Sequence, residues 1–466
     1  MIPVYAPQFS VTLRKMVRPQ ASAAPRLKIP ATLDLTPFLG ESGAISVTKG
    51  IYDQAGGFSV TFPDKVEPQT GESLYTIIEP MDCIEIRAAR SPSVSPGAGK
   101  ELPVLMRGWV DTVRRGESMS DNSPQRAVVV QGRDAAKFWH ISNVIFQIAF
   151  LQDAPFLNVF QMQAATGMSA EAFTVNEFMR QIVGAVNHTL GSAYSGHGFK
   201  DFQAAASVPD GSLIPNMVAD YQGSFWRLAD SYADRPWNEL FIEEMDAGPT
   251  LVFRPAPFKS IDGDYILKGA VDPGALKLDI ADVVSLEVCR SDSRVSNFFW
   301  VSPGQNSLNT NGFVTTAALQ AGIPYEQGHA NNDPSVYGIR QPMEHSTSLL
   351  CDGVPDPRAP ISGDSLVDWH IQRMHDLRDM NHDNVALEEG SAIVKGSEML
   401  KAGRYLQIAR GTSTAEYYLT RVAHALGPYR AWTSSLTLER GDGFLRRVRG
   451  PKASYWAEGR KGPYDA

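Results

Sequence analysis

The residues best suited to metal chemistry are three histidines in the C-terminal third of the chain. His370, His375 and His382 lie on or just beyond one predicted helix, with Asp376 and Asp379 between them. Two zinc ligands on one helical face need a spacing of four residues. The separations here are five (370 to 375) and seven (375 to 382), and five residues place the first pair about 140° apart around the helix. We therefore expect a solvated helix face and no bound metal or cofactor.

Acidic pairs are the next chemical candidates. Glu243 and Glu244 are adjacent, and Asp262 and Asp264 are separated by one residue. A glycosidase needs two carboxylates on either side of a sugar, one of them with a raised pKa. Acidic pairs are common in turns, and sequence alone does not show such an environment. Hydrolysis of a polysaccharide or cell wall is therefore kept only as an alternative.

Motifs for nucleophilic or phosphate chemistry are missing from the sequence. There is no Gly-x-Ser-x-Gly elbow, and no local pattern joins Cys83 or Cys351 to a histidine. The run 97–101 superficially resembles a phosphate loop. However, Val94 stands where the first glycine belongs, and Glu101 replaces the hydroxyl residue that would reach magnesium. We predict a surface turn there, no catalytic or cofactor-binding residue, and a protein that is not an enzyme.

The charge balance disfavours a protein whose main task is gripping nucleic acid. The 466 residues carry a net charge of -8, whereas such proteins usually present a basic face. The one clear basic cluster lies near the C-terminus and consists of Arg446, Arg447, Arg449 and Lys452. It is interpreted either as a solvated tail or as a docking strand for a partner.

The cysteines give no sign of a disulfide framework or zinc knuckle. Cys83, Cys289 and Cys351 are odd in number and far apart, and no Cys-x-x-Cys motif occurs. Cys83 and Cys289 fall in strand-like stretches, so we expect both to be small core residues. Synthesis in a reducing cytosol fits this usage.

No export signal or membrane-spanning segment is expected. Residues 1–9 contain prolines and lack an apolar signal core. The longest apolar run, 144–151, is much shorter than the ~20 residues that span a bilayer.

Aromatic residues that could stack on sugars or bases lie in mixed apolar stretches. They are Trp226, Trp237, Trp300 and Trp432. Core or interface packing is the favoured interpretation.

Alternating hydrophobicity predicts β-strands across residues 31–138. Phe58, Val60 and Phe62 alternate with polar residues, and Ile84 and Ile86 flank Glu85. A period of two indicates one buried face and one wet face. Further β-rich runs at 104–113 and 126–130 suggest an antiparallel barrel or sandwich.

Two helices stand out from the strands. The first begins at a capping box, Thr174 to Glu177, carries an apolar stripe and is expected to end at Gly191. The second is predicted over 365–380, with Ser365 and Asp368 as its capping box. The glycosylation sequon at Asn187 lies inside the first helix and is discounted.

Later strands are predicted at 240–245 and 251–254, which form a hairpin, and at 283–290 and 298–301. The best strands of the last block are 405–408, 417–422 and 434–439. The two β blocks could be a diverged internal duplication.

The fold class that follows is α+β, mainly β, with two antiparallel β-barrel-like tube domains and helical insertions. We predict an N-terminal arm at 1–30, the first tube-like domain at 31–138 and a helical or mixed insertion at 139–235. The second tube-like domain combines 236–300 with 383–447, a long loop plus helix occupies 301–382, and 448–466 form a C-terminal tail.

Several stretches, taken in order, resemble the central hub proteins of phage tail baseplates and related tail-tip proteins. They are 106–111 (MRGWVD) with 128–134 (VVVQGRD), 238–241 with 251–255, 336–340, and 417–424 with 433–441. Each motif is weak alone, and their order over residues 31–447 carries the resemblance.

The resemblance implies a homotrimer whose two tube-like domains per chain form a pseudo-sixfold ring. Such a ring would adapt the sixfold tail tube, or a distal tail protein, to a threefold central spike. Its lumen would hold the end of the tape measure protein and later pass DNA, with baseplate wedge proteins as further partners. The location implied is the baseplate of a virion tail, assembled in the host cytoplasm. A tail-associated hydrolase and a receptor- or glycan-binding tail protein remain the alternatives.

Overall fold

The chain is described by a computed structural model. It describes residues 7–16, 31–91, 102–120, 123–146, 173–194, 200–209, 212–213, 221–245, 247–261, 263–303, 331–340, 343–347, 363–410 and 413–443. Strands account for 47% and helices for 19%, so the predicted mainly β class is confirmed.

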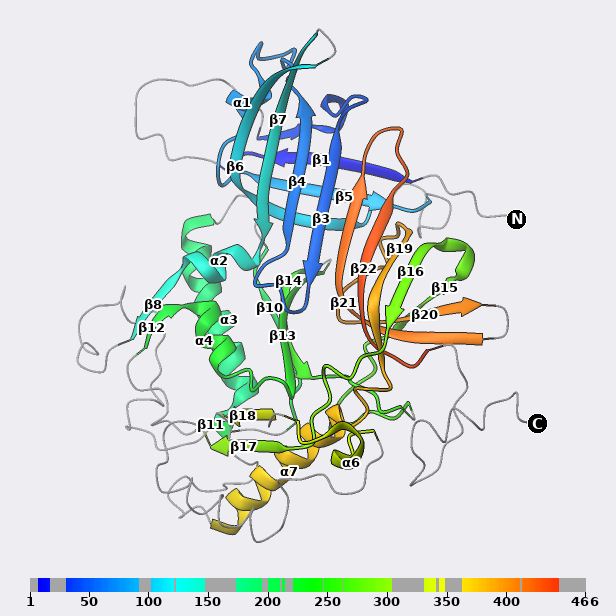
Figure 1. Ribbon diagram of the computed structural model, residues 1–466. Helices are drawn as coiled ribbons and strands as arrows, with labels where there is room; N and C mark the ends of the chain where they lie inside the picture. The colour runs from blue at the N-terminus through cyan, green and yellow to red at the C-terminus, as the bar shows by residue number, and fades with distance from the viewer. Residues whose placement is uncertain are drawn as a thin grey trace.

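One thirteen-stranded sheet dominates the molecule (Figure 1). Its strands are β1 (Gln8–Arg14), β2 (Thr32–Asp34), β3 (Ala44–Gly50), β4 (Gly57–Pro63), β5 (Cys83–Ala89), β6 (Val104–Ser120), β7 (Ser123–Asp134), β15 (Ala275–Asp279), β16 (Val283–Cys289), β19 (Glu388–Lys395), β20 (Tyr405–Arg410), β21 (Ser413–Leu426) and β22 (Thr433–Gly441). Among these described strands the sheet stays open at β2, β15 and β16, and no barrel closes.

Most of the smaller elements lie below or to the left of this sheet in Figure 1, whereas α1 lies beside its upper end. The helices are η1 (Thr36–Phe38), α1 (Leu74–Ile77), α2 (Ala136–Ile141), α3 (Val175–Tyr194), α4 (Phe225–Ser231), η5 (Ile280–Asp282), α6 (Pro334–Tyr337) and α7 (Gly363–Asn381). The strands are β8 (Asn143–Phe146), β9 (Phe173–Thr174), β10 (Gln203–Ala206), β11 (Ser212–Leu213), β12 (Tyr221–Ser224), β13 (Asn238–Met245), β14 (Gly248–Pro255), β17 (Phe299–Pro303) and β18 (Met343–Thr347).

The large sheet consists of two blocks with the same strand order. The N-terminal block runs β3-β4-β7-β6-β5-β1, and the C-terminal block runs β16-β19-β22-β21-β20-β15. Corresponding strands appear in the same sequence order in both blocks. Their directions also agree, except that β15 is parallel to β20 whereas β1 is antiparallel to β5. An internal duplication would produce this arrangement.

A bulge at matching positions strengthens the correspondence. In the β6–β7 ladder the register shifts between Val110 and Thr112, and in the β21–β22 ladder it shifts between Leu419 and Arg421. The first residue of the neighbouring strand is Cys83 in β5 and Tyr405 in β20. It pairs with Trp109 and Tyr418 respectively, and in both strands the bulge comes two residues after this paired position. The hairpins β6–β7 and β21–β22 therefore share the same pairing pattern, including the position of the bulge.

Each block encloses its own apolar core. Alternating residues of β3, β4 and β7, such as Val47, Val60 and Val130, are fully or almost fully buried in the first core. In the second core Leu278, Leu406 and Leu436 are buried in the same way. The period-two pattern predicted for Phe58, Val60 and Phe62 is confirmed, because all three are buried on one face of β4.

The two blocks are joined by direct strand pairing. The C-terminal part of β21, from Arg421 to Leu426, pairs antiparallel with β3, from Gly50 to Ile45. The preceding part of the same edge, from Ser413 to Tyr418, pairs with β20. A single strand edge thus serves both blocks, and the β3–β21 pairing is here called the seam.

The wet face predicted for the Ile84 and Ile86 strand is wrong. Glu85 is also buried, because Arg107 of the neighbouring β6 and Arg87 hydrogen-bond to its carboxylate. Charged side chains can occupy a buried face when their hydrogen bonds are satisfied in this way.

Helix α3 begins as predicted but ends later. The Thr174 hydroxyl accepts a hydrogen bond from Glu177 N, and the Glu177 carboxylate accepts one from Thr174 N, which confirms the capping box. The predicted stripe of Val175, Phe178, Met179, Ile182 and Val186 is buried. The expected end at Gly191 is wrong, since the helix continues to Tyr194.

The sequon residue Asn187 has a structural role instead. Its side-chain amide donates to Phe202 O and its carbonyl accepts from Phe202 N, at 2.9 and 2.8 Å. The side chain thereby fixes the segment before β10 against α3.

The second helix and the hairpin were located correctly. Helix α7 begins at Gly363, so the cap predicted at Ser365 is wrong, although the helix itself is confirmed. Strands β13 and β14 form the predicted antiparallel hairpin, and β10 adds to β14 in parallel.

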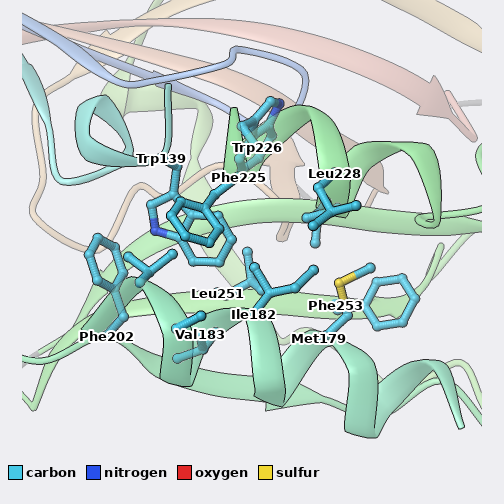
Figure 2. Close-up of a cluster of buried hydrophobic side chains, with 14 of the residues drawn as sticks. Trp139, Met179, Ile182, Val183, Phe202, Phe225, Trp226, Leu228, Leu251 and Phe253 are labelled. Carbon is cyan, nitrogen blue, oxygen red and sulfur yellow. The ribbon is translucent and has the colours of Figure 1, made fainter. Parts of the chain in front are cut away.

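Helices α2, α3 and α4 share a third core with the face of β14 (Figure 2). Figure 2 shows Trp139, Phe225 and Ile182 gathered between the helices, with Leu251 and Phe253 approaching from the strand. Trp139 stacks edge-on against Phe202, with ring centroids 5.7 Å apart. This layer supports the hairpin β13–β14, which in turn contacts Tyr418 of β21.

The seam should weaken in acid because of His424. Burial lowers the pKa of this β21 histidine to about 4, whereas the unfolded chain restores a value near 6.5. The unfolded state then binds the proton at higher pH, so stability is present above pH 6.5 and is lost as the pH falls toward 4. We expect a loss of about 2–3 kcal/mol between pH 7 and pH 4.5 from this group.

Urea unfolding at both pH values measures this effect. The His424→Gln variant should lose about 2–3 kcal/mol less than the wild type over the same interval, whatever its stability at pH 7. Equal losses in the two proteins would contradict the assignment.

Candidate assembly surfaces

The sheet ends at β16 in an edge strand that presents unpaired backbone groups. Among the described strands, β16 pairs with β19 on one side only. Val284 is 65% exposed, and Leu286 and Val288 cover the second core only in part. An edge with exposed apolar side chains is a template for adding another strand.

The β6–β7 hairpin extends beyond its block as a two-stranded arm, which rises above the sheet in Figure 1. Strand β5 pairs with β6 only up to Trp109, whereas β7 follows β6 as far as Ser120. From Arg114 to Met119 every residue of the arm is exposed, and Met119 is 73% exposed. Strand β4 pairs with β7 only as far as Ala127, so beyond Gly116 the arm consists of two strands alone. A two-stranded ribbon is marginally stable in water, and this tip is therefore suited to packing against a partner.

A buried charged cluster attaches the β13–β14 hairpin to the seam strand. Glu239 of β13 accepts hydrogen bonds from Arg254 of β14 at 3.0 and 3.1 Å and from the Tyr418 hydroxyl of β21 at 2.5 Å. Arg254 also donates to Gly403 O at 2.6 Å. Burial raises the pKa of Glu239, while Arg254 and Tyr418 act in the opposite direction.

A second buried network ties β5 and β6 to β13. Arg107 bridges Glu85, at 3.1 Å, and Glu244. The neighbouring guanidinium groups, with Arg87 first, hold the pKa of Glu85 below its usual value despite burial. Burial raises the pKa of Glu244 even though Arg107 contacts it. No short-range sequence pattern indicates this network, because its members lie on three separate strands.

The acidic pair Glu243 and Glu244 does not form a sugar-cleaving site. Adjacent strand residues point to opposite faces, so the two carboxylates do not flank one ligand. Glu244 contacts Arg107, and Glu243 contacts Lys401 at 2.8 Å. A cavity of about 50 Å³ lies beside them, between β3, β6, β13 and β21, and its volume matches a few buried waters. Asp264 is exposed, and Asp262 lies outside the described residues.

The three histidines of α7 and its C-terminal end are not a shared site. The predicted solvated face is wrong for His370, which is only 1% exposed. Burial lowers the pKa of His375, and His382 lies 3.1 Å from Asp383. In the ranges that the structure describes, no group of three or more His, Cys, Asp or Glu side chains is placed to hold a metal ion.

The cysteines differ from each other in burial. Cys83 is buried as predicted, and burial raises its pKa to about 12, which makes it a poor nucleophile. The core position predicted for Cys289 is wrong, because this residue lies exposed at the end of the edge strand β16. Cys351 lies outside the described residues.

The tryptophans act mainly as core residues. Trp226, Trp237 and Trp432 are buried, as predicted, and Trp300 is partly buried. Trp237 also packs beside the Arg373 guanidinium, whose carbon lies 5.0 Å from the indole centroid. The turn at 97–101 and the basic cluster at 446–452 lie outside the described residues.

No helix in the described part of the chain is long and apolar enough to cross a membrane.

The chain is similar in its overall arrangement to solved tail proteins. The first is a tail protein from Neisseria meningitidis, at 9% identity and a TM-score of 0.47, covering 92% of this chain and 96% of that one. The second is the 43 kDa tail protein of prophage MuSo2 from Shewanella oneidensis, at 11% identity and a TM-score of 0.44, covering 93% and 97%. A prophage tail protein, gp18, from Listeria monocytogenes follows at 9% identity and a TM-score of 0.40, covering 92% and 94%.

No family model and no curated protein sequence matches the chain. The structural neighbours are phage tail and baseplate proteins, the class that the sequence resemblance named. Identities near one tenth and TM-scores below 0.5 describe a shared arrangement only.

Breaking the Glu239 cluster should detach the hairpin from β21. Arg254→Met leaves a buried carboxylate without its cation and is expected to cost about 3–5 kcal/mol in urea unfolding. Adding Glu239→Gln removes the uncompensated charge and should recover at least ~1 kcal/mol.

Arg404→Met is the matched control for that pair. Arg404 is about one-third exposed and lies 3.5 Å from Glu243, so its loss should cost no more than about 1 kcal/mol. If Arg254→Met were as mild as the control, the cluster would not be what holds the hairpin.

Proposed function

We propose that this chain is the structural hub of a phage-type tail baseplate, acting as a homotrimeric ring. The observation that carries the proposal is the presence of two blocks with the same strand order in one chain. Three such chains would supply six similar blocks around an axis with only threefold exact symmetry. A ring of this kind can face a sixfold tube on one side and a threefold spike on the other.

The exposed edges support an assembly role. Heterologous contacts that close into a ring require two different surfaces on each chain, and the edge strand β16 and the β6–β7 arm are two such surfaces. The buried charged clusters fix the hairpin and both blocks in one geometry, which a symmetry adaptor needs.

The further partners follow from the same proposal. They are a tail tube or distal tail protein, a central spike protein, the end of the tape measure protein and baseplate wedge proteins, with DNA passing through the lumen. The site of action would be the tail baseplate of the virion, after assembly in the host cytoplasm. The two tube-like domains keep the proposed boundaries of 31–138 and of 236–300 with 383–447.

A purely structural role agrees with how the candidate chemical groups are used. The acidic pair is committed to ion pairs, and the thiol of Cys83 is buried. A tail-associated hydrolase and a receptor- or glycan-binding tail protein are the alternatives from other functional classes.

Light scattering after size exclusion tests the oligomeric state. The full chain, at increasing concentration, should give a species of three chain masses that negative-stain microscopy shows as a ring. The His424→Gln variant should keep this mass at pH 7, because the seam lies within each chain.

Other outcomes would favour the alternatives. A protein that remains monomeric at high concentration and releases sugars or peptides from peptidoglycan or capsule would be a hydrolase. A monomer that binds surface glycans without cleaving them would be a receptor-binding protein.

A further inference from the structure

Within the chain the two blocks are joined by one strand pairing, between β21 and β3. The corresponding strand edge of the N-terminal block, on β6, has no such partner among the described strands. In the C-terminal block, β21 gives the first part of one edge to β20 and the second part to β3. In the N-terminal block, β6 gives the corresponding first part to β5. The second part of that edge, beyond Trp109, has no partner strand in the described chain.

The matching bulges set the correspondence between the two strands residue by residue. Trp109 corresponds to Tyr418 and Thr112 to Arg421, because each pair stands at the same place in its ladder. The seam segment Arg421 to Leu426 therefore corresponds to Thr112 to Glu117 of β6. At Gly116, the space where a side chain would stand is open for 4 Å.

The strand that would fill this edge is the counterpart of β3. Strand β16 pairs with β19 as β3 pairs with β4. Aligning these two ladders places Val288 of β16 at the position of Val47 and Leu286 at that of Ile45. Ile45 and Val47 are 2% and 1% exposed, since β21 covers them, whereas Leu286 and Val288 remain half-buried. Strand β16 thus occupies the position of β3 in its block but lacks the second neighbouring strand that β3 has in β21.

We propose that β16 of one copy adds antiparallel to the free part of β6 in the next copy, in the register that the seam uses within the chain. This inference rests on the proposed homo-oligomer and names the strands that join its copies. Within the chain, Thr48 lies opposite Ala423 and Ser46 opposite Ala425. Across copies, Cys289 would therefore lie opposite the partner's Arg114, and Glu287 opposite the partner's Gly116.

The charges at this junction are complementary. Glu287 and Arg114 are both exposed, and neither makes an ion pair within the part of the chain that the structure describes. In the proposed register they are diagonal neighbours on one face, a separation that long side chains span. The same addition covers two exposed edges at once, that of β16 and that of β6 beyond Trp109, and so removes two templates for unspecific strand pairing.

Cross-linking of full-length protein tests the register. In a Cys351→Ser background, Arg114→Cys should form a disulfide with Cys289 of the neighbouring copy under mild oxidation. Non-reducing electrophoresis should then show linked species up to the full ring. Two controls should stay unlinked: Arg115→Cys, whose side chain points to the opposite face, and Arg114→Cys combined with Cys289→Ser.

Glu287→Arg provides a second readout that does not depend on oxidation. It places like charges beside the partner's Arg114, so the concentration for half-assembly in light scattering should rise at least several-fold. Arg114→Glu added to it should restore assembly in part.

The outcomes separate this inference from the proposed function. A stable three-chain ring in which Arg114→Cys does not link, while Arg115→Cys does or neither does, overturns the register and leaves the hub proposal standing. A protein that neither assembles nor links overturns both.

Discussion

The seam between β3 and β21 is the constraint on which the rest of the molecule depends. It joins strands from opposite ends of the sequence and makes one sheet of two blocks that each have their own core. Backbone hydrogen bonds fix strands in both distance and register, whereas apolar contact alone fixes neither. The distance and the register between the two blocks are therefore set by the hydrogen bonds of the β3–β21 ladder.

Charged clusters extend this rigidity to the hairpin. Glu239, Arg254 and Tyr418 connect β13 and β14 to the seam strand, and Glu85, Arg107 and Glu244 connect the same hairpin to β5 and β6. Buried ion pairs contribute little net stability, but a wrong arrangement that leaves one member unpaired is strongly disfavoured. These clusters consequently select one packing of the hairpin between the blocks.

Sequence patterns predicted individual strands and helices better than they predicted which of these elements lie side by side. The alternation of Phe58, Val60 and Phe62 and the capping box at Thr174 depend on nearby residues, and both were found as expected. The burial of Glu85 and His370 and the exposure of Cys289 depend on which distant strand or helix lies alongside. No short-range pattern encodes that choice.

The assembly edges were missed for a related reason. A strand rich in β-branched residues, such as β16, has the same sequence pattern whether it lies in the centre or at the edge of a sheet. The loss of alternation after Val113, where charged residues replace apolar ones, was the one local sign that β6 leaves its core. The common strand order of the two blocks could be suspected from two β-rich regions, but it became visible only through strand pairing.

The seam also imposes an order on the making of the protein. On the ribosome, β3 emerges early, and the part of β21 that covers it follows some 370 residues later (421 minus 50). At a synthesis rate of roughly 5–20 residues per second, the edge of β3 waits roughly 20–70 s for its partner. During that interval the nascent N-terminal block exposes the kind of edge through which chains join one another. Chaperone protection, or slow elongation near β21, would therefore bear directly on how many chains become assembly-competent.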